Sequence, residues 1–308
     1  MQNVVINGAS GFIGSHLLDY LLEMGKNVFV LTRDPIKFSN KKYQNLTLIK
    51  YDSENYSSVK DQFKNVDIDV FFNMAWAGVS PEYKNDVDLQ ISNIGRTVKA
   101  AAFASEVNCK LFVSAGTVAE YVFSKDVMDV NAKQTPNDIY GASKVATHYF
   151  LDVFTRKNKL PFIWCIVPSA FGEGRTDNNI ITYTIRTLLR GERPSYGNLE
   201  QMWDFLYVKE IAKALYLIGE KGIPGKVYGI GSGVYKPLKE YVTIIRDIIN
   251  PKLELGIGDK PELSYQTYSS CVNIDDLTKD TGFIPEIQFE EGIRKTIEWF
   301  KNNVIIRG

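Results

Sequence analysis

The stretch INGASGFIGSHL, residues 6–17, constrains the fold of this chain more than any other feature. It follows a short apolar run at residues 3–8 and opens a stretch at residues 11–25 whose apolar positions have helical spacing. Gly8, Gly11 and Gly14 therefore fall in a turn from strand to helix. Glycines there let backbone N–H groups approach a phosphate at the helix N-terminus. An ordinary turn rarely needs three glycines at this spacing, so the pattern predicts a site for a dinucleotide pyrophosphate.

Apolar runs alternate with helical patterns through the first half of the chain. The predicted strands after the first lie at residues 27–33, 46–52, 69–76, 109–116 and 161–169, and the further helices lie at about 55–64, 84–105 and 138–158. Strands that are continuously apolar and alternate with helices indicate a parallel sheet covered on both faces. We therefore expect a doubly wound parallel α/β domain over residues 1–169.

The pattern loosens after residue 169. A polar, glycine-rich segment precedes a predicted helix at 177–194, a strand at 203–208 and a helix at 208–220, and further helices are expected near 237–249 and 288–303. No linker sets this half apart. We expect residues 170–308 to form a smaller C-terminal α/β substrate-binding lobe that is interleaved with the end of the sheet.

Charge and composition exclude several classes of function. The 36 Lys and Arg residues balance 36 Asp and Glu residues without a basic stripe, which argues against nucleic-acid binding. Cys109, Cys165 and Cys271 lie far apart and are expected to be buried thiols, and the two histidines lack metal-ligand spacing, so no metal site is predicted. The chain opens directly into a strand and carries no apolar run of membrane-spanning length, so we expect a cytoplasmic protein without membrane contact.

Tyr140 and Lys144 are four residues apart on a predicted helix and so share one face. The pKa of a free tyrosine is near 10, and a nearby ammonium group favours the phenolate and lowers this pKa. In the direction of reduction, the same phenol donates a proton to a carbonyl oxygen as hydride arrives at carbon. Following a glycine turn and several strands, the pair is predicted to be catalytic.

Together these segments resemble the extended branch of the short-chain dehydrogenase/reductase superfamily, which includes nucleotide-sugar epimerases, dehydratases and reductases. The motifs that carry the resemblance are GASGFIGSHL (8–17), GTVAEY (116–121), YGASK (140–144), PSAFGEG (168–174) and QMWDFLYV (201–208). The resemblance covers nearly the whole chain. It implies a Rossmann sheet that binds NAD(P), and a homodimer that pairs the helices at 84–105 and 138–158.

The resemblance also implies which residues form the site. Thr117, Tyr140 and Lys144 match the catalytic positions, and Ser114 is the second choice for the catalytic hydroxyl. The expected cofactor-binding residues are Gly8, Ser10, Gly11, Phe12, Ile13, Gly14, Thr32, Arg33, Asp52, Ser53, Ala75, Asn93, Ser114, Tyr140, Lys144, Pro168 and Ser169. The expected substrate-binding residues are Trp76, Ser80, Glu120, Asn179, Tyr196 and Trp203. Trp203 departs from the pattern, because many relatives carry a phosphate-binding arginine there.

Two departures bear on cofactor and reaction. NAD-specific members place an acidic residue at the end of the second strand, whereas this chain has Thr32 and Arg33, and an arginine suits the 2′-phosphate of NADP. Asp34 follows directly, so NAD remains the alternative. The 4,6-dehydratases follow their catalytic threonine with an Asp-Glu pair, but Val118 and Ala119 cannot transfer protons, so dehydration is not expected.

The leading interpretation is an NADP-dependent reductase of a nucleotide-linked keto-sugar, with a 4-keto-6-deoxyhexose as the natural candidate. The alternative is an NAD-dependent nucleotide-sugar 4-epimerase on the same scaffold. A reductase of non-nucleotide ketones is disfavoured by WDFLYV (203–208) and Asn179. A redox-sensing regulator that binds NADP without turnover would typically lack the Tyr/Lys pair, which this chain keeps.

Overall fold

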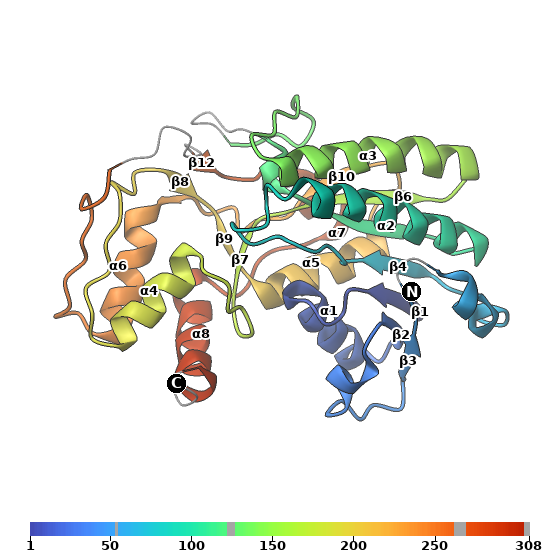
Figure 1. Ribbon diagram of the computed structural model, residues 1–308, viewed down its shortest axis with the longest axis horizontal. Helices are drawn as coiled ribbons and strands as arrows, with labels where there is room; N and C mark the ends of the chain where they lie inside the picture. The colour runs from blue at the N-terminus through green and yellow to red at the C-terminus, as the bar shows by residue number, and fades with distance from the viewer. Residues whose placement is uncertain (53–54, 122–126, 262–268, 305–308) are drawn as a thin grey trace.

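A seven-stranded parallel sheet forms the centre of the structure, a computed structural model that describes residues 1–52, 55–121, 127–261 and 269–304 (Figure 1). The strand order is β10-β6-β5-β4-β1-β2-β3. The strands are β1 (Asn3–Asn7), β2 (Asn27–Thr32), β3 (Leu46–Lys50), β4 (Val70–Asn73), β5 (Phe112–Thr117), β6 (Phe162–Val167) and β10 (Val227–Gly229). All six pairings are parallel, which confirms the predicted doubly wound Rossmann fold.

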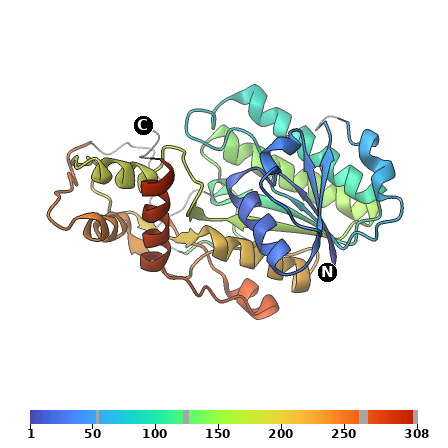
Figure 2. The same ribbon diagram turned by 90° about the horizontal axis from the view of Figure 1, so that it is seen from below.

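Helices cover both faces of this sheet (Figures 1 and 2). On one face α1 (Phe12–Glu23) packs against α5 (Val208–Lys221), and on the other α2 (Val87–Glu106) packs against α3 (Ile139–Asn158). Neighbouring residues of one strand serve the two layers, since Phe72 belongs to the first core and Phe71 to the second. This double burial explains why the strands are continuously apolar in sequence.

The strand order reverses between β1 and β4, and this reversal positions the site. The chain runs outward from β1 through β2 to β3, then returns to place β4 on the other side of β1. The loops after β1 and β4 therefore diverge at the carboxyl end of the sheet. Open α/β sheets bind ligands in the crevice at such a switch point.

A second unit is built from the later part of the chain. The helices α4 (Ile180–Leu189), α6 (Leu238–Ile249) and α8 (Phe289–Asn303) share a third hydrophobic core, and β8 (Met202–Trp203) lies between β11 (Lys236–Pro237) and β12 (Ser269–Ser270) in a small sheet. A two-stranded parallel sheet joins β7 (Ser169–Phe171) to β9 (Phe205–Tyr207). Because α5 and β10 return to the central sheet layer, the second half is interleaved with the first.

Several elements differ from their predicted extents. The helix expected at 177–194 is α4, which begins after Asn179 because this side chain accepts hydrogen bonds from the N–H groups of Ile181 and Thr182. The strand expected at 203–208 is divided into β8 and β9 by the buried Asp204, whose carboxylate accepts the N–H of Ser232 at 3.0 Å. The helix expected at 55–64 is a 3₁₀ helix, and α7 (Asp275–Thr281) was not predicted.

The three cysteines are buried thiols, as the sequence predicts. Cys109, Cys165 and Cys271 are free and buried. Across the ranges that the structure describes, no helix is long and apolar enough to cross a membrane, and no group of three or more His, Cys, Asp or Glu residues could hold a metal ion.

Candidate active site

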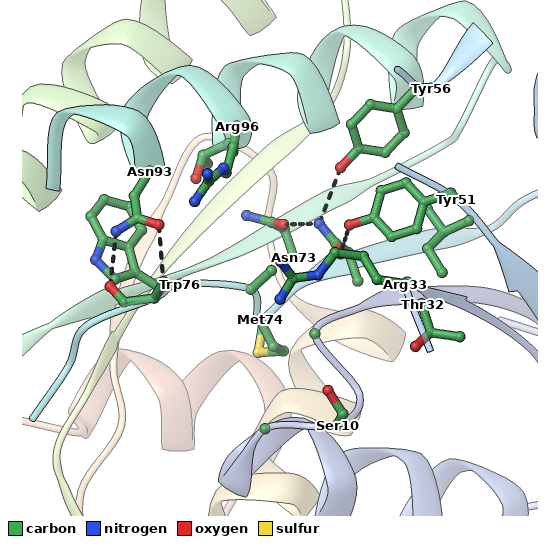
Figure 3. Close-up of a pocket in the computed structure, with 17 residues that line it drawn as sticks. Ser10, Thr32, Arg33, Tyr51, Tyr56, Asn73, Met74, Trp76, Asn93 and Arg96 are labelled. Carbon is green, nitrogen blue, oxygen red and sulfur yellow. Dashed lines mark hydrogen bonds between the residues drawn. The ribbon is translucent and has the colours of Figure 1, made fainter. Parts of the chain in front are cut away.

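A cavity of about 260 Å³ lies at the switch point of the sheet (Figure 3). Its wall is formed by the glycine turn after β1, the ends of β2 and β4, Tyr51 directly after β3, and one face of α2. Gly8 has φ +93°, and a Cβ there would lie 2.5 Å from the backbone nitrogen of Ala75, so only glycine fits. The turn after β1 thus comes close to the loop after β4 without a side chain between them.

Helix α1 begins at this turn without a side-chain cap. Gly11 is its N-cap residue, and the first turn holds no acidic side chain. The first N–H groups of a helix lack intrahelical partners and carry a partial positive charge. The turn therefore suits an anion, as the sequence pattern predicts for a pyrophosphate.

The charged side chains of the cavity wall are both cationic. Arg33 extends from the end of β2 and Arg96 from α2, and Figure 3 shows both directed toward the cavity. No Asp or Glu lines the cavity within the described part of the chain. A polar network backs this wall: the Tyr51 hydroxyl donates to Asn7 Oδ1 at 2.6 Å, and Asn7 Nδ2 donates to Asn73 Oδ1 at 2.9 Å.

The three predicted catalytic residues lie together next to this cavity. Thr117 ends β5, and its side chain is hydrogen-bonded to the Tyr140 hydroxyl. Lys144 lies one turn further along α3 and donates to the carbonyl oxygen of Ala115 at 2.6 Å. Ser114, the competing hydroxyl, is 1% exposed and accepts from Asn73 Nδ2 at 3.3 Å. The geometry therefore favours Thr117 as the partner of Tyr140.

The expected effect of Lys144 on Tyr140 was wrong for the structure as it stands. Burial raises the pKa of Tyr140 to about 12, although the hydrogen bond with Thr117 acts in the opposite direction. The negative charges of Glu120 and Asp138 raise this pKa further. The Lys144 nitrogen lies 6.0 Å from the centre of the Tyr140 ring, and burial lowers the pKa of Lys144 itself. At neutral pH Tyr140 is accordingly a phenol that can donate a proton.

Apart from Tyr140, Lys144 and Ser53, about half of the predicted cofactor-binding residues line the cavity. Those that do are Gly8, Ser10, Gly11, Thr32, Arg33, Ala75 and Asn93, and those that do not are Phe12, Ile13, Gly14, Asp52, Ser114, Pro168 and Ser169. Asn93 fixes the loop after β4, because its amide donates to the carbonyl oxygen of Ala77 at 2.9 Å and accepts the Ala77 N–H. Asp52 is exposed, and Tyr51 lines the cavity instead. Ser53 lies outside the described residues.

The predicted substrate residues are more scattered. Trp76 lines the cavity and Ser80 follows on the same loop, which is compatible with a contact to a ligand. Glu120 is 0% exposed, Tyr196 is 5% exposed with its hydroxyl 2.6 Å from Thr184 Oγ1, and neither residue lines the cavity. The Asn179 side chain caps α4.

Trp203 is half-buried in β8, and its ring lies against Phe205 with 6.2 Å between ring centres. Its indole N–H has no hydrogen-bond partner among the described residues.

Sequence reasoning missed Tyr51, Tyr56, Asn73 and Arg96, all of which line the cavity. Asn73 ends a predicted strand at the edge where ligands bind, so its position was a usable signal. Arg96 lies three residues after Asn93 on α2 and therefore on the same helix face, which was also visible in the sequence. For Tyr51 and Tyr56 only the finished fold brings the side chains to Asn7.

Comparison with known proteins agrees with this geometry. Human dTDP-D-glucose 4,6-dehydratase is 25% identical over 98% of this chain and 91% of its own length. The structure of UDP-N-acetylglucosamine 4-epimerase from Methanobrevibacter ruminantium, in complex with UDP-N-acetylmuramic acid, is 26% identical with a TM-score of 0.87 and covers 98% of this chain and 99% of that one. UDP-glucuronic acid 4-epimerase from Bacillus cereus, in complex with UDP-glucuronic acid and NAD, has the same TM-score and coverage at 17% identity.

A family model also matches this chain, in addition to these single relatives. The model of the NAD dependent epimerase/dehydratase family matches residues 4–231, which include the glycine turn, Thr117, Tyr140 and Lys144. The chain therefore belongs to the NAD dependent epimerase/dehydratase family, an extended short-chain dehydrogenase/reductase type of enzyme.

Proposed function

We propose that the protein is an NADP-dependent reductase of a nucleotide-linked keto-sugar, with an NDP-4-keto-6-deoxyhexose as substrate. The observation that carries this proposal is the charge of the cavity wall, where Arg33 and Arg96 face the space and no carboxylate does within the described residues. A guanidinium group binds a phosphate through two hydrogen bonds, whereas a ribose with free hydroxyls is bound by a carboxylate. The wall therefore suits the 2′-phosphate of NADP.

Asp34 does not supply the missing carboxylate. Its side chain accepts the N–H of Ile36 at 3.1 Å as the cap of the following 3₁₀ turn, and it does not line the cavity. Thr32, at the end of β2, has its hydroxyl engaged with the backbone of Asp34. This arrangement supports NADP over NAD in this chain. NADPH is drawn from a reduced pool, so NADP preference in turn favours net reduction over a reaction that recycles its cofactor.

The catalytic group suits proton donation to a carbonyl oxygen. When bound, the nicotinamide would supply the hydride. Tyr140 is protonated at neutral pH, and Thr117 holds its hydroxyl at the end of β5, so that the phenol can give its proton to the developing alkoxide. The Lys144 ammonium, one turn along α3, would stabilise the phenolate that remains.

The same geometry disfavours dehydration, although several relatives are named dehydratases. Val118 and Ala119 follow Thr117 in a 3₁₀ turn and offer no group that can transfer a proton. Glu120 comes next, but its carboxylate is directed inward and accepts the N–H of Thr117 at 2.8 Å. Elimination of water would need an acid and a base on the substrate side of this turn.

A nucleotide-sugar 4-epimerase is the second candidate, because the relatives of known structure include 4-epimerases that match this chain over nearly its whole length. One experiment separates the two functions. Purified protein is mixed with NADPH and a panel of 4-keto-6-deoxy sugar nucleotides, and the loss of nicotinamide absorbance is followed. In parallel, UDP-hexoses are incubated with NAD and separated by anion-exchange chromatography. NADPH consumption supports the reductase, whereas epimer formation without net cofactor change would replace it by the epimerase.

A further inference from the structure

Glu120 is a fully buried acid next to the catalytic residues. Its carboxylate accepts the Thr117 N–H at 2.8 Å, the Trp164 indole N–H at 3.2 Å and the Gln134 amide at 3.0 Å. Gly116 leaves room for this arrangement, because a Cβ there would lie 2.6 Å from Glu120 Oε1 and 2.3 Å from Trp164 Nε1. The site is thus built around the carboxylate.

The partners of Glu120 fit its ionised form. All three are N–H donors, and within the described residues no acceptor is placed to take a carboxyl proton. An ionised carboxylate only accepts hydrogen bonds, whereas a protonated one must also donate. Burial raises the pKa of Glu120, and the donors that point at both oxygens act in the opposite direction by stabilising the negative charge.

The surroundings of the Lys144 nitrogen suit a cation. Its nitrogen lies 3.9 Å from the centre of the Trp76 ring and 5.9 Å from that of Trp164, and it donates to Ala115 O. The faces of aromatic rings attract a cation. Lys144 is nevertheless 4% exposed, and burial alone favours the neutral amine. Trp164 connects the two groups, because its ring lies 5.9 Å from the Lys144 nitrogen while its indole N–H donates to Glu120 at 3.2 Å, and the negative charge of Glu120 favours the ammonium form of Lys144.

We infer that Glu120 is a positioning residue whose buried carboxylate keeps Lys144 charged and in place near Tyr140. Trp164 and Gln134 hold the carboxylate, and the Trp76 ring lies against the ammonium. The inference rests on the proposed function only for its catalytic consequence, since the charge on Lys144 is a property of the protein without substrate. A neutral Lys144 would no longer stabilise the phenolate of Tyr140.

The titratable groups near Glu120 and Lys144 leave a pH range in which these two residues can be followed. Burial lowers the pKa of His148, whose Nδ1 lies 3.4 Å from Gln134 Nε2, to about 4. The pKa of Tyr140 is about 12, and burial raises that of Tyr121 as well. Asp138 at the start of α3 also acts on Tyr140 through its negative charge. Of Glu120, Lys144, His148, Tyr121 and Tyr140, only Glu120 and Lys144 should therefore titrate between roughly pH 5 and 10.

The test follows the ionisation of Lys144 directly. Protein labelled with ¹³C at the lysine Cε is titrated by NMR, and the signal of Lys144 is assigned by its loss in Lys144→Met. In Glu120→Gln the titration midpoint of Lys144 should fall by about 1–3 pH units, the usual influence of one close opposite charge. Glu106→Gln, which removes an exposed carboxylate paired with Lys60 on the same face of the sheet, should leave the midpoint unchanged.

A midpoint that stays at its wild-type value in folded Glu120→Gln would overturn the inference and leave Glu120 as a turn-stabilising residue only. If that variant does not fold, Gln134→Leu takes its place. The loss of one donor from the carboxylate should lower the Lys144 midpoint by a smaller amount, and no change would again refute the idea. Failure of every keto-sugar to react would contradict the proposed function while leaving this titration intact, so the two failures can be told apart.

Discussion

The ammonium of Lys144 lies 3.9 Å from the centre of the Trp76 ring, and the same indole lines the cavity at the switch point of the sheet. Trp76 is held there by its N–H, which donates to Gln90 at 2.9 Å, and by an edge-on contact with Tyr140 at 6.2 Å between ring centres. One side chain therefore separates the predicted cofactor site from the catalytic pair. A cofactor that enters the cavity must come close to this indole.

Trp76 should report cofactor binding through its fluorescence. NADPH is expected to quench the emission of the four tryptophans, and Trp76→Phe should remove the larger share of this change because only Trp76 lines the cavity. Trp299→Phe, in helix α8 of the second unit, is the matched control and should preserve it. Equal quenching in wild type and Trp76→Phe would show that the cofactor binds elsewhere.

Tyr140→Phe should separate binding from chemistry. The change removes the proton donor but keeps the ring, the glycine turn and both arginines, so NADPH affinity should stay within a few-fold of wild type. Turnover should fall by roughly 10²–10⁴, the usual contribution of a general acid. Stopped-flow binding and steady-state reduction measure the two quantities. Turnover near the wild-type rate would assign the proton transfer to another group.

Local sequence patterns predicted those parts of the fold that depend only on residues close together in the sequence. The apolar runs predicted the strands of the central sheet because both faces are buried, and the i, i+4 spacing placed Tyr140 and Lys144 on one face of α3. The glycine turn was predictable because Gly8 needs a positive φ and a close approach to Ala75. These features need no knowledge of distant residues.

Features that depend on distant contacts were not predictable in the same way. Glu120 belongs to a motif expected to face the substrate, but its direction is set by Trp164 on β6 and by Gln134. Tyr51 joins the cavity because Thr32 of β2 pairs with Lys50 of β3, which brings the next residue to the same edge. Asp204 interrupts an apolar run. Its carboxylate accepts the N–H of Ser232, which lies 28 residues away in the sequence. In each case tertiary contacts override the local pattern.

We predict that the exposed faces of α2 and α3 form the interface of the expected homodimer. Ile91 of α2 is 57% exposed, and Tyr149 and Phe150 of α3 are 63% and 61% exposed. A contiguous exposed apolar patch is typical of an interface, and these side chains lie on two helices that pack against each other. Phe150→Glu should convert the protein to a monomer in sedimentation velocity, whereas Ile284→Glu, at an equally exposed position outside these helices, should not. A wild-type protein that sediments as a monomer would contradict the dimer.

Asp69 should make stability depend on acid pH. Burial alone would raise its pKa, but the N–H groups of Gln2 and Asn3 and the ammonium of Lys110 outweigh it and lower the pKa to about 2. A carboxyl whose pKa is depressed on folding stabilises the native state above its unfolded pKa and loses this effect as pH falls. Asp69→Asn should lower the free energy of unfolding by roughly 1–2 kcal/mol at pH 7. In urea denaturation the difference from wild type should shrink between pH 4 and 2, and a constant difference would refute this origin.

Arg33 and Arg96 should together determine the preference between NADPH and NADH. If both guanidinium groups hold the 2′-phosphate, each alanine variant loses a charge-assisted contact that NADH never makes, and NADPH affinity should fall roughly tenfold or more in each. NADH affinity should stay nearly constant, which separates this effect from general damage to the cavity. Arg186→Ala, a guanidinium in α4 outside the cavity wall, is the control for lost positive charge.

Thr32→Asp tests the same wall from the opposite direction. A carboxylate at the end of β2 would repel the 2′-phosphate and accept the ribose hydroxyls, so the variant should bind NADH better and NADPH worse. The measurement is the ratio of the two dissociation constants in wild type and in all variants. A wild-type ratio that favours NADH would refute the NADP assignment. Because net reduction is inferred from the use of NADPH, the same result would make the 4-epimerase the better-supported function.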